Sequence, residues 1–134
     1  MPYHEYLNIP FKFRGRDKQG TDCLGLMWMY LRSRGYVIPD RDGLPMLHDN
    51  QEDFLERAIK GLQKIGQQIN VPQNDDIVLM NLPGGYTHIG VVVSNDQMLH
   101  VLKDRPSVVE PIRKYRRRIV AIFRPSPSRK RPGF

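Results

Sequence analysis

Apolar residues in the first half of the chain recur at helical spacing, and this pattern predicts two helices. The first helix is expected over 23–34, and Gly35 follows it as a residue suited to end a helix. Asp22 precedes this segment, and its carboxylate is suited to accept from the free N–H groups of the first turn. A second helix is expected to begin after Asp49 or Asn50, because the apolar residues that follow are again three and four positions apart.

Beyond Pro72 the apolar residues fall into short runs bounded by turn residues, which predicts strands. The expected strands cover 76–82, 88–94, 97–102, a short segment around 108–109, and 119–124. Segments 1–22 and 36–49 are rich in Gly and Pro and are expected to be irregular. Helices followed by a run of strands indicate an α+β fold, in which N-terminal helices pack on an antiparallel β-sheet.

The turn between the second and third expected strands decides whether two histidines share a face of the sheet. His88 and His100 share a face only if this loop contains an odd number of residues. A three-residue loop over 94–96 places His100 opposite Gly90, diagonal to His88, whereas a two-residue loop over 95–96 separates the rings. We expect the three-residue loop, because Asn and Asp tolerate the left-handed conformation that a bulged loop requires.

Length and composition limit the classes of function. A chain of 134 residues is one domain, which we expect to cover 1–124, followed by a basic Pro/Ser-rich tail over 125–134. The single cysteine excludes an internal disulfide, and no apolar run approaches the 18 residues of a membrane-spanning helix. The first residues lack a basic segment followed by an apolar one, so we expect no signal peptide and synthesis in the cytoplasm.

The net charge of +7 is concentrated near the C-terminus. From Arg113 onward there are nine Lys or Arg residues and no acidic residue, grouped mainly at 113–118 and 129–131. Such clusters suit nucleic acid, an anionic polymer or an acidic protein groove, although a solvated surface has the same composition. Because a Pro/Ser-rich tail does not order by itself, we expect a neighbouring subunit to hold it.

The only cysteine lies where a reactive thiol is expected. Cys23 falls in the first turn of the first expected helix, where unpaired N–H groups and the helix dipole favour a thiolate. His88 and His100 lie in two apolar runs downstream. Taken singly, a lone Cys is most often a small buried hydrophobe and a strand His a core residue. Together, a thiolate, a base and a group that orients the base are the parts of a cysteine hydrolase.

Several short motifs surround these three residues. They are Pro10-Phe11 with the basic segment 14–17, the segment 20–26 around the cysteine, the strand start 76–78, and the histidine segments 86–91 and 99–101. Over roughly residues 5–124 they resemble the NlpC-type cysteine peptidases, papain-like enzymes of bacterial cell-wall turnover. The resemblance implies that Cys23 is the nucleophile, His88 the general base and His100 the group that orients it. The implied reaction is hydrolysis of a peptidoglycan stem peptide through a thioester, with no metal and no organic cofactor.

Two residues depart from the family pattern. Leu24 replaces the usual Ser, and Phe11 stands where the family commonly has a Tyr whose hydroxyl points into the site. The loss of one such donor can lower the rate by about 10²–10³-fold, and Tyr6 or Tyr86 are the candidates to replace it. An alternative interpretation is therefore a structural protein that retains the fold with weak or no activity.

The short form of these motifs most resembles versions encoded among bacteriophage tail genes. This implies an enzyme carried in the virion, in a tail tip or baseplate, that opens the host wall during DNA entry. Other tail proteins, contacted through the basic C-terminal tail, are then the expected partners, and a toxin delivered by a contractile secretion apparatus follows the same logic. We expect no membrane insertion. Direct nucleic-acid binding is not expected either, since a basic sheet interleaved with aromatic residues and a recognition helix are both lacking.

Overall fold

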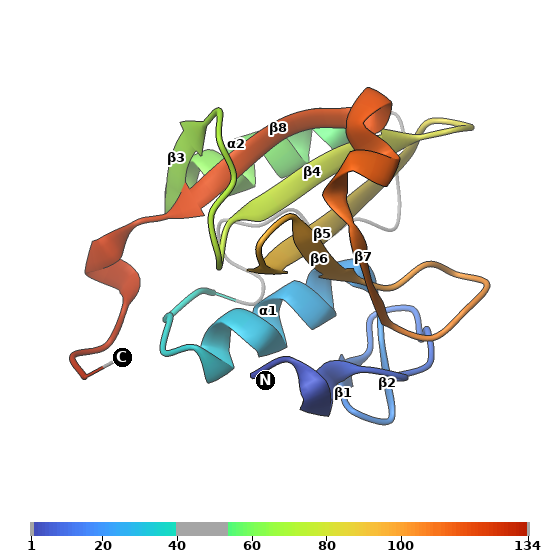
Figure 1. The fold of residues 1–134 in the computed structure, drawn as a ribbon, viewed down its shortest axis with the longest axis horizontal. Coiled ribbons are helices and arrows are strands. Elements are labelled where there is room, and N and C mark those ends of the chain that lie inside the picture. Colours follow the sequence, from blue (N-terminus) through green and yellow to red (C-terminus); the bar gives the residue numbers. More distant parts are fainter. Residues whose placement is uncertain (1, 40–53, 134) are drawn as a thin grey trace.

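The computed structural model describes residues 2–39 and 54–133, which form the expected α+β fold around an antiparallel sheet of six strands (Figure 1). The helices are α1 (Cys23–Ser33) and α2 (Phe54–Ile65), with short 3₁₀ helices η1 (His4–Tyr6), η3 (Ile112–Arg118) and η4 (Pro127–Arg129). The sheet strands are β3 (Gly66–Ile69), β4 (Ile77–Leu82), β5 (Tyr86–Ser94), β6 (Gln97–His100), β7 (Val108–Pro111) and β8 (Ile119–Pro125), in the order β3-β8-β4-β5-β6-β7. A separate hairpin joins β1 (Arg16–Asp17) to β2 (Gly20–Thr21). In the described part of the chain, no helix is long and apolar enough to cross a membrane.

The two faces of the sheet are covered by different elements. One face packs against α1 and α2 in the main core, to which Leu31, Leu62 and Leu79 contribute fully buried side chains. A smaller core, which includes Met80 and Ile112, lies on the other face under η3. In Figure 1, α1 (cyan) and η3 (orange) accordingly lie on opposite sides of the sheet. The sheet therefore separates the helix that carries the only cysteine from the basic segment around 113–118.

The first predicted helix is confirmed together with both of its end signals. The Asp22 carboxylate accepts from the Gly25 N–H at 2.8 Å, and Gly35 adopts the left-handed φ of 94° just beyond the helix. The second helix is also present, but its predicted start after Asp49 or Asn50 lies outside the described residues. The strand predictions are confirmed within a few residues, whereas β1, β2, β3 and the 3₁₀ helices were not predicted.

The loop between β5 and β6 is shorter than predicted, but the two histidines lie on the same face of the sheet as expected. Ser94 pairs with Gln97, so the loop contains the two residues 95–96 rather than the expected three. Val93 is an extra residue on β5 and forms a β-bulge, which shifts the pairing by one position. Because the bulge supplies the odd residue, the histidines still lie on the same face.

Gly90 makes room for this arrangement. The β5–β6 pairing continues so that Gly90 lies opposite His100. A Cβ atom at Gly90 would lie 2.8 Å from the Met98 sulfur and 3.5 Å from the His100 Cβ. A side chain at this position would therefore have to displace the Met98 side chain, whereas its contact with the His100 Cβ would be an ordinary one.

The C-terminal tail docks on the segment that directly follows the chain's own first helix, which corrects the expectation that a neighbouring subunit holds it. The Val37 N–H donates to the Arg129 carbonyl oxygen at 2.7 Å, and the Arg131 N–H donates to the Gly35 carbonyl oxygen at 2.8 Å. These bonds flank an isolated antiparallel bridge between Tyr36 and Lys130. The segment that follows α1 thus supplies the backbone partners that a Pro/Ser-rich tail lacks by itself.

A buried carboxylate at the start of β4 gives a stability prediction. Asp76 is 1% exposed and binds the Arg124 guanidinium through two bonds of 3.0 Å. We expect Arg124→Leu to lower the free energy of unfolding by about 2 kcal/mol, because it leaves a buried charge unpaired while Arg124 itself is partly exposed. Urea denaturation measures the loss. Arg113→Leu removes an exposed cation as a control, and an equal effect of both changes would contradict the prediction.

Candidate active site

Cys23 is the first residue of α1, directly after the capping residue Asp22. Besides the Gly25 N–H, the Asp22 carboxylate accepts from the Arg14 N–H at 3.1 Å and from the Arg16 guanidinium at 2.8 Å. One side chain therefore fixes both the helix start and the loop that packs on it. This network places the thiol at a defined point of the fold.

Gly25 allows this loop to approach the helix closely. A Cβ atom at Gly25 would lie 2.3 Å from the Gly15 carbonyl oxygen and 2.8 Å from the Arg16 Nη1. Both distances are far shorter than van der Waals contact, so only glycine fits. The glycine two positions after the cysteine thus has a packing role.

The thiol itself is buried, and its pKa is raised rather than lowered. Cys23 is 9% exposed, and burial, followed by the nearby charge of Asp22, raises the pKa of the thiol to about 12. Backbone hydrogen bonds from Ile89 and Leu24 and the charge of Arg16 act in the opposite direction without reversing the shift. The expectation of a thiolate stabilised by the helix N-terminus is therefore wrong for this structure, in which the thiol is protonated at neutral pH.

Alkylation of Cys23 tests this correction, because only the thiolate reacts. With a pKa of about 12, the rate in the folded protein should rise about tenfold per pH unit and reach no plateau below about pH 10. The same protein in denaturing urea is the control, since its only cysteine should then titrate near 8.5. A plateau at or below pH 8.5 in the folded protein would show an activated thiol and contradict the prediction.

A buried chain of hydrogen bonds leads away from His88. Its Nε2 lies 2.8 Å from His100 Nδ1, and His100 Nε2 lies 2.8 Å from Glu110 Oε1. The contact between the two rings is the one that the diagonal pairing predicts. Glu110 was not predicted, and it lies opposite Met98 on β6, so it shares a face with His100. The structure thus extends the predicted pair of histidines to a carboxylate.

Glu110 is held as an ion by its neighbours. Burial raises its pKa, but hydrogen bonds from Lys114, Tyr115 and His100, together with the charge of Arg105, lower it to about 2. The Lys114 ammonium lies 2.5 Å from Oε2, the Tyr115 hydroxyl donates to Oε1 at 2.8 Å, and the Arg105 guanidinium also binds Oε1. Glu110 is therefore ionised throughout the neutral range.

An ionised Glu110 determines which ring nitrogens carry protons. A carboxylate only accepts, so His100 Nε2 donates to it and the Nδ1 of a neutral His100 accepts from His88 Nε2. The remaining nitrogen, His88 Nδ1, then has a free lone pair. It is buried and has no hydrogen-bond partner among the described residues. The chain of bonds therefore ends in an unoccupied base.

Both rings are neutral near pH 7. Burial, followed by the charges of His100 and Arg105, lowers the pKa of His88 to about 3. Burial also lowers the pKa of His100, although its bond to Glu110 opposes the shift. The resting site thus combines a protonated thiol with a neutral imidazole.

The contact between α1 and β5 brings the sulfur to the residue next to His88. A backbone hydrogen bond joins the Cys23 sulfur to Ile89, which follows His88 in β5. Among the described residues, the thiol makes no hydrogen bond to either ring. The sulfur is therefore bound at the backbone of the residue that follows the histidine whose Nδ1 is free.

Tyr86, and not Tyr6, is the tyrosine near the thiol. Burial and then the charge of Cys23 raise the pKa of Tyr86. Tyr6 instead packs edge to face on Tyr30 in the main core, with ring centroids 5.9 Å apart. Phe11 bridges to β2 and packs against the same core. Within residues 2–39 and 54–133, no group of His, Cys, Asp and Glu side chains could hold a metal ion.

Comparisons with known proteins are consistent with this geometry. The model of the NlpC/P60 family matches residues 8–123. The crystal structure of the NlpC/p60 domain of the peptidoglycan hydrolase SagA superposes with a TM-score of 0.63 at 19% identity, over 92% of each chain. An NlpC/P60 family protein from Bacillus cereus gives a TM-score of 0.63 at 19% identity, over 91% of this chain and 37% of that one.

A third structure is the peptidoglycan hydrolase RipB from Mycobacterium tuberculosis, with a TM-score of 0.57 at 20% identity, over 89% of this chain and 58% of that one. The chain thus spans only about a third of the Bacillus cereus protein and somewhat more than half of RipB. No curated protein sequence matches the chain. At these identities, the solved structures establish the fold alone.

Proposed function

The chain belongs to the NlpC/P60 family, and on this premise we propose that it is a cysteine peptidase that hydrolyses an amide bond of peptidoglycan stem peptides. The observation that supports the proposal is the hydrogen-bond chain from Glu110 through His100 to His88. It ends in an unpartnered Nδ1 on His88, and the backbone of the next residue, Ile89, binds the Cys23 sulfur. A neutral base in this position can take the thiol proton at neutral pH.

The proposed reaction begins from the neutral thiol and imidazole. As the Cys23 sulfur attacks the amide carbon, its proton passes to His88 Nδ1, and the new imidazolium is stabilised through His100 and Glu110. The Cys23 N–H, at the first residue of α1, donates to the developing oxyanion. His88 then protonates the leaving amine, and a thioester forms. Water, deprotonated by His88, hydrolyses the thioester and regenerates the thiol.

The test compares the wild type with Cys23→Ala on isolated peptidoglycan, with mass spectrometry of the soluble fragments. The wild type should release peptides with a new amino terminus and a new carboxyl terminus, and the variant should release none. Matching thermal unfolding curves of the two proteins show that the substitution leaves the fold intact. Equal release by both proteins, or release by neither, would contradict the proposal.

A non-catalytic protein with the same fold is the second candidate. The burial and raised pKa of Cys23 favour it, as does Phe11 at the position of the family's tyrosine. Release by neither protein in the experiment above, on several wall types, is the result expected for this candidate.

We also propose that the enzyme reaches the wall as part of a phage tail tip or baseplate. The support is the resemblance of segments 14–17 and 20–26 to tail-encoded versions of the family. Since the C-terminal tail docks on the chain itself, a neighbouring tail protein would contact the exposed side of the docked tail, which includes Arg131. Mass spectrometry of purified particles should detect the chain at a fixed ratio to other tail proteins, and its absence would overturn this assignment.

A further inference from the structure

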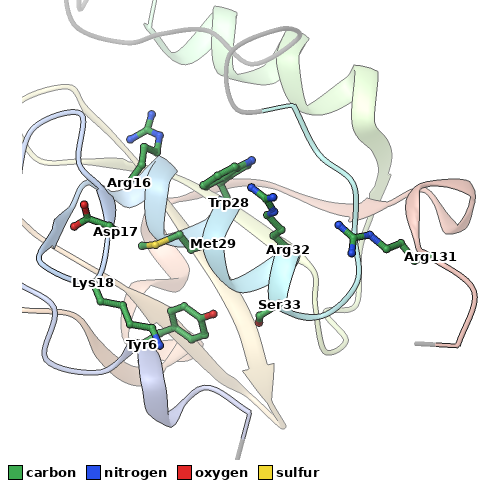
Figure 2. A pocket seen from close by; sticks show the side chains of 9 residues that line it. All are labelled: Tyr6, Arg16, Asp17, Lys18, Trp28, Met29, Arg32, Ser33 and Arg131. Atoms are coloured by element: carbon green, nitrogen blue, oxygen red, sulfur yellow. The ribbon is translucent and has the colours of Figure 1, made fainter.

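The outward face of α1 lines an open groove of about 560 Å³. Its lining residues, drawn in Figure 2, are Tyr6, Arg16, Asp17, Lys18, Trp28, Met29, Arg32, Ser33 and Arg131. A smaller depression of about 130 Å³ shares Trp28, Arg32 and Arg131 with it, so the two are continuous. We call this surface the α1 groove. None of its residues takes part in the hydrogen-bond chain of the candidate active site.

The α1 groove is strongly cationic. Four of its side chains are Lys or Arg, and a single carboxylate, Asp17, faces them. Arg32 and Arg131 form no ion pair with any described residue, and the Arg32 guanidinium lies over the Trp28 ring at 5.1 Å. The groove therefore combines two guanidinium groups that pair with no carboxylate of the described residues with an aromatic surface.

Docking of the tail builds one end of the groove. The bond from the Arg131 N–H to the Gly35 carbonyl oxygen fixes the tail beside the end of α1. Figure 2 shows Arg131 beyond Arg32, with Trp28 and then Arg16 following toward the other end. The basic cluster at 129–131, which the catalytic proposal leaves without a role, thus contributes a cation to a defined surface.

The other end of the groove reaches the helix start that carries the cysteine. The Arg16 guanidinium lines the groove and binds the Asp22 carboxylate at 2.8 Å. Asp22 directly precedes Cys23. A polymer that lies along the groove would consequently pass close to the start of α1.

We propose that the α1 groove binds an anionic wall polymer, a glycan chain with repeated carboxylate or phosphate groups, and thereby holds the enzyme beside its cleavage site. The inference rests on the proposed function, because it takes the bacterial wall as the substrate. Charge complementarity supports it, since repeated anions can meet Arg32 and Arg131 together. Trp28 lies under the Arg32 guanidinium and holds it in the groove through a cation–π contact. The carboxylates of peptidoglycan and the phosphates of polymers attached to it share this chemistry.

The test measures co-sedimentation of Cys23→Ala protein with isolated cell walls, so that no bound polymer is cut. In this background, Arg32→Gln with Arg131→Gln should weaken binding at least about fivefold, as expected for the loss of two exposed charge contacts. Arg116→Gln with Arg117→Gln is the matched control, because it removes the same charge from the exposed η3. The control should change binding less than about twofold, and rising salt should weaken the binding of the unaltered groove.

Walls stripped of phosphodiester-linked polymers distinguish the two sources of anions. Binding that survives stripping assigns the groove to peptidoglycan carboxylates, and binding lost on stripping assigns it to the phosphates; either supports the proposal. Equal weakening by both variant pairs, no binding to walls, or tighter binding to a DNA oligonucleotide than to walls would overturn it. Because the assay records sedimentation and not cleavage, its outcome is independent of whether the wild type is an active peptidase.

Discussion

Replacing His88 with alanine should lower kcat on a peptidoglycan stem peptide by about 10⁴-fold or more. Because burial raises the pKa of the Cys23 thiol to about 12, the thiol is protonated at pH 7, so the reaction depends on a base to take the proton. His88 Nδ1 is an unpartnered base, and the next residue, Ile89, binds the sulfur through its backbone. Separation of the peptide products by chromatography measures the rate.

The control for this variant is His4→Ala, which removes an exposed histidine and should leave kcat unchanged. A His88→Ala protein that retains more than about a tenth of the wild-type rate while remaining folded would rule out His88 as the base.

The same histidine should make stability depend on pH. Burial, followed by the charges of His100 and Arg105, lowers the pKa of His88 to about 3, whereas in the unfolded chain it titrates near 6.5. Its contribution to stability is therefore complete above about pH 6.5 and is lost progressively as the pH falls toward 3. Urea denaturation at several pH values should show a shallower decline for His88→Ala than for the wild type, and equal slopes would contradict the shift.

Replacing Glu110 with glutamine should lower kcat by about 10²–10⁴-fold, although Glu110 touches neither the sulfur nor the substrate. The larger figure corresponds to a triad in which the orienting acid is replaced and the histidine takes the wrong tautomer. A glutamine amide can donate to His100 Nε2, which would place the His100 proton on Nδ1 and turn His88 Nε2 into the acceptor. His88 Nδ1 would then carry a proton and lose its function as a base.

Glu110 is therefore a positioning residue, and its test needs a measurement that a merely structural role would not change. Glu110→Gln should lower kcat with little change in KM, and Glu110→Asp should restore part of kcat because it keeps an ionised acceptor. Glu56→Gln, the same substitution on the exposed face of α2, is the control. If Glu110→Asp and Glu110→Gln lower kcat to the same extent, the carboxylate has no orienting role.

The sequence predicts a candidate site residue when a local pattern in the neighbouring residues marks its position. Cys23 was identified from its place after Asp22, and the His88–His100 contact from strand alternation. Glu110 was missed because its position depends on the pairing of β7 with β6, which no local pattern reveals. The raised pKa of the thiol was missed for the same reason, since its burial is produced by packing against β5.

The same distinction applies to the secondary structure: local patterns predict some elements, whereas others depend on contacts between distant segments. Strands made of short apolar runs were predicted, whereas β3 has the sequence Gly-Gln-Gln-Ile and is stabilised by pairing with β8 at the edge of the sheet. The docked tail was likewise unpredictable, because its backbone bonds form with residues almost a hundred positions away.

The extra residue Val93 also determines how an insertion or deletion in the β5–β6 hairpin would affect the candidate active site. Removing one residue from the paired part of the hairpin would shift the pairing of β5 with β6 by one position. Side chains of the two strands that now share a face of the sheet would then point to opposite faces. His88 would then turn away from His100, even though every residue of the site is still encoded. Viable insertions and deletions within these two strands should accordingly come in pairs.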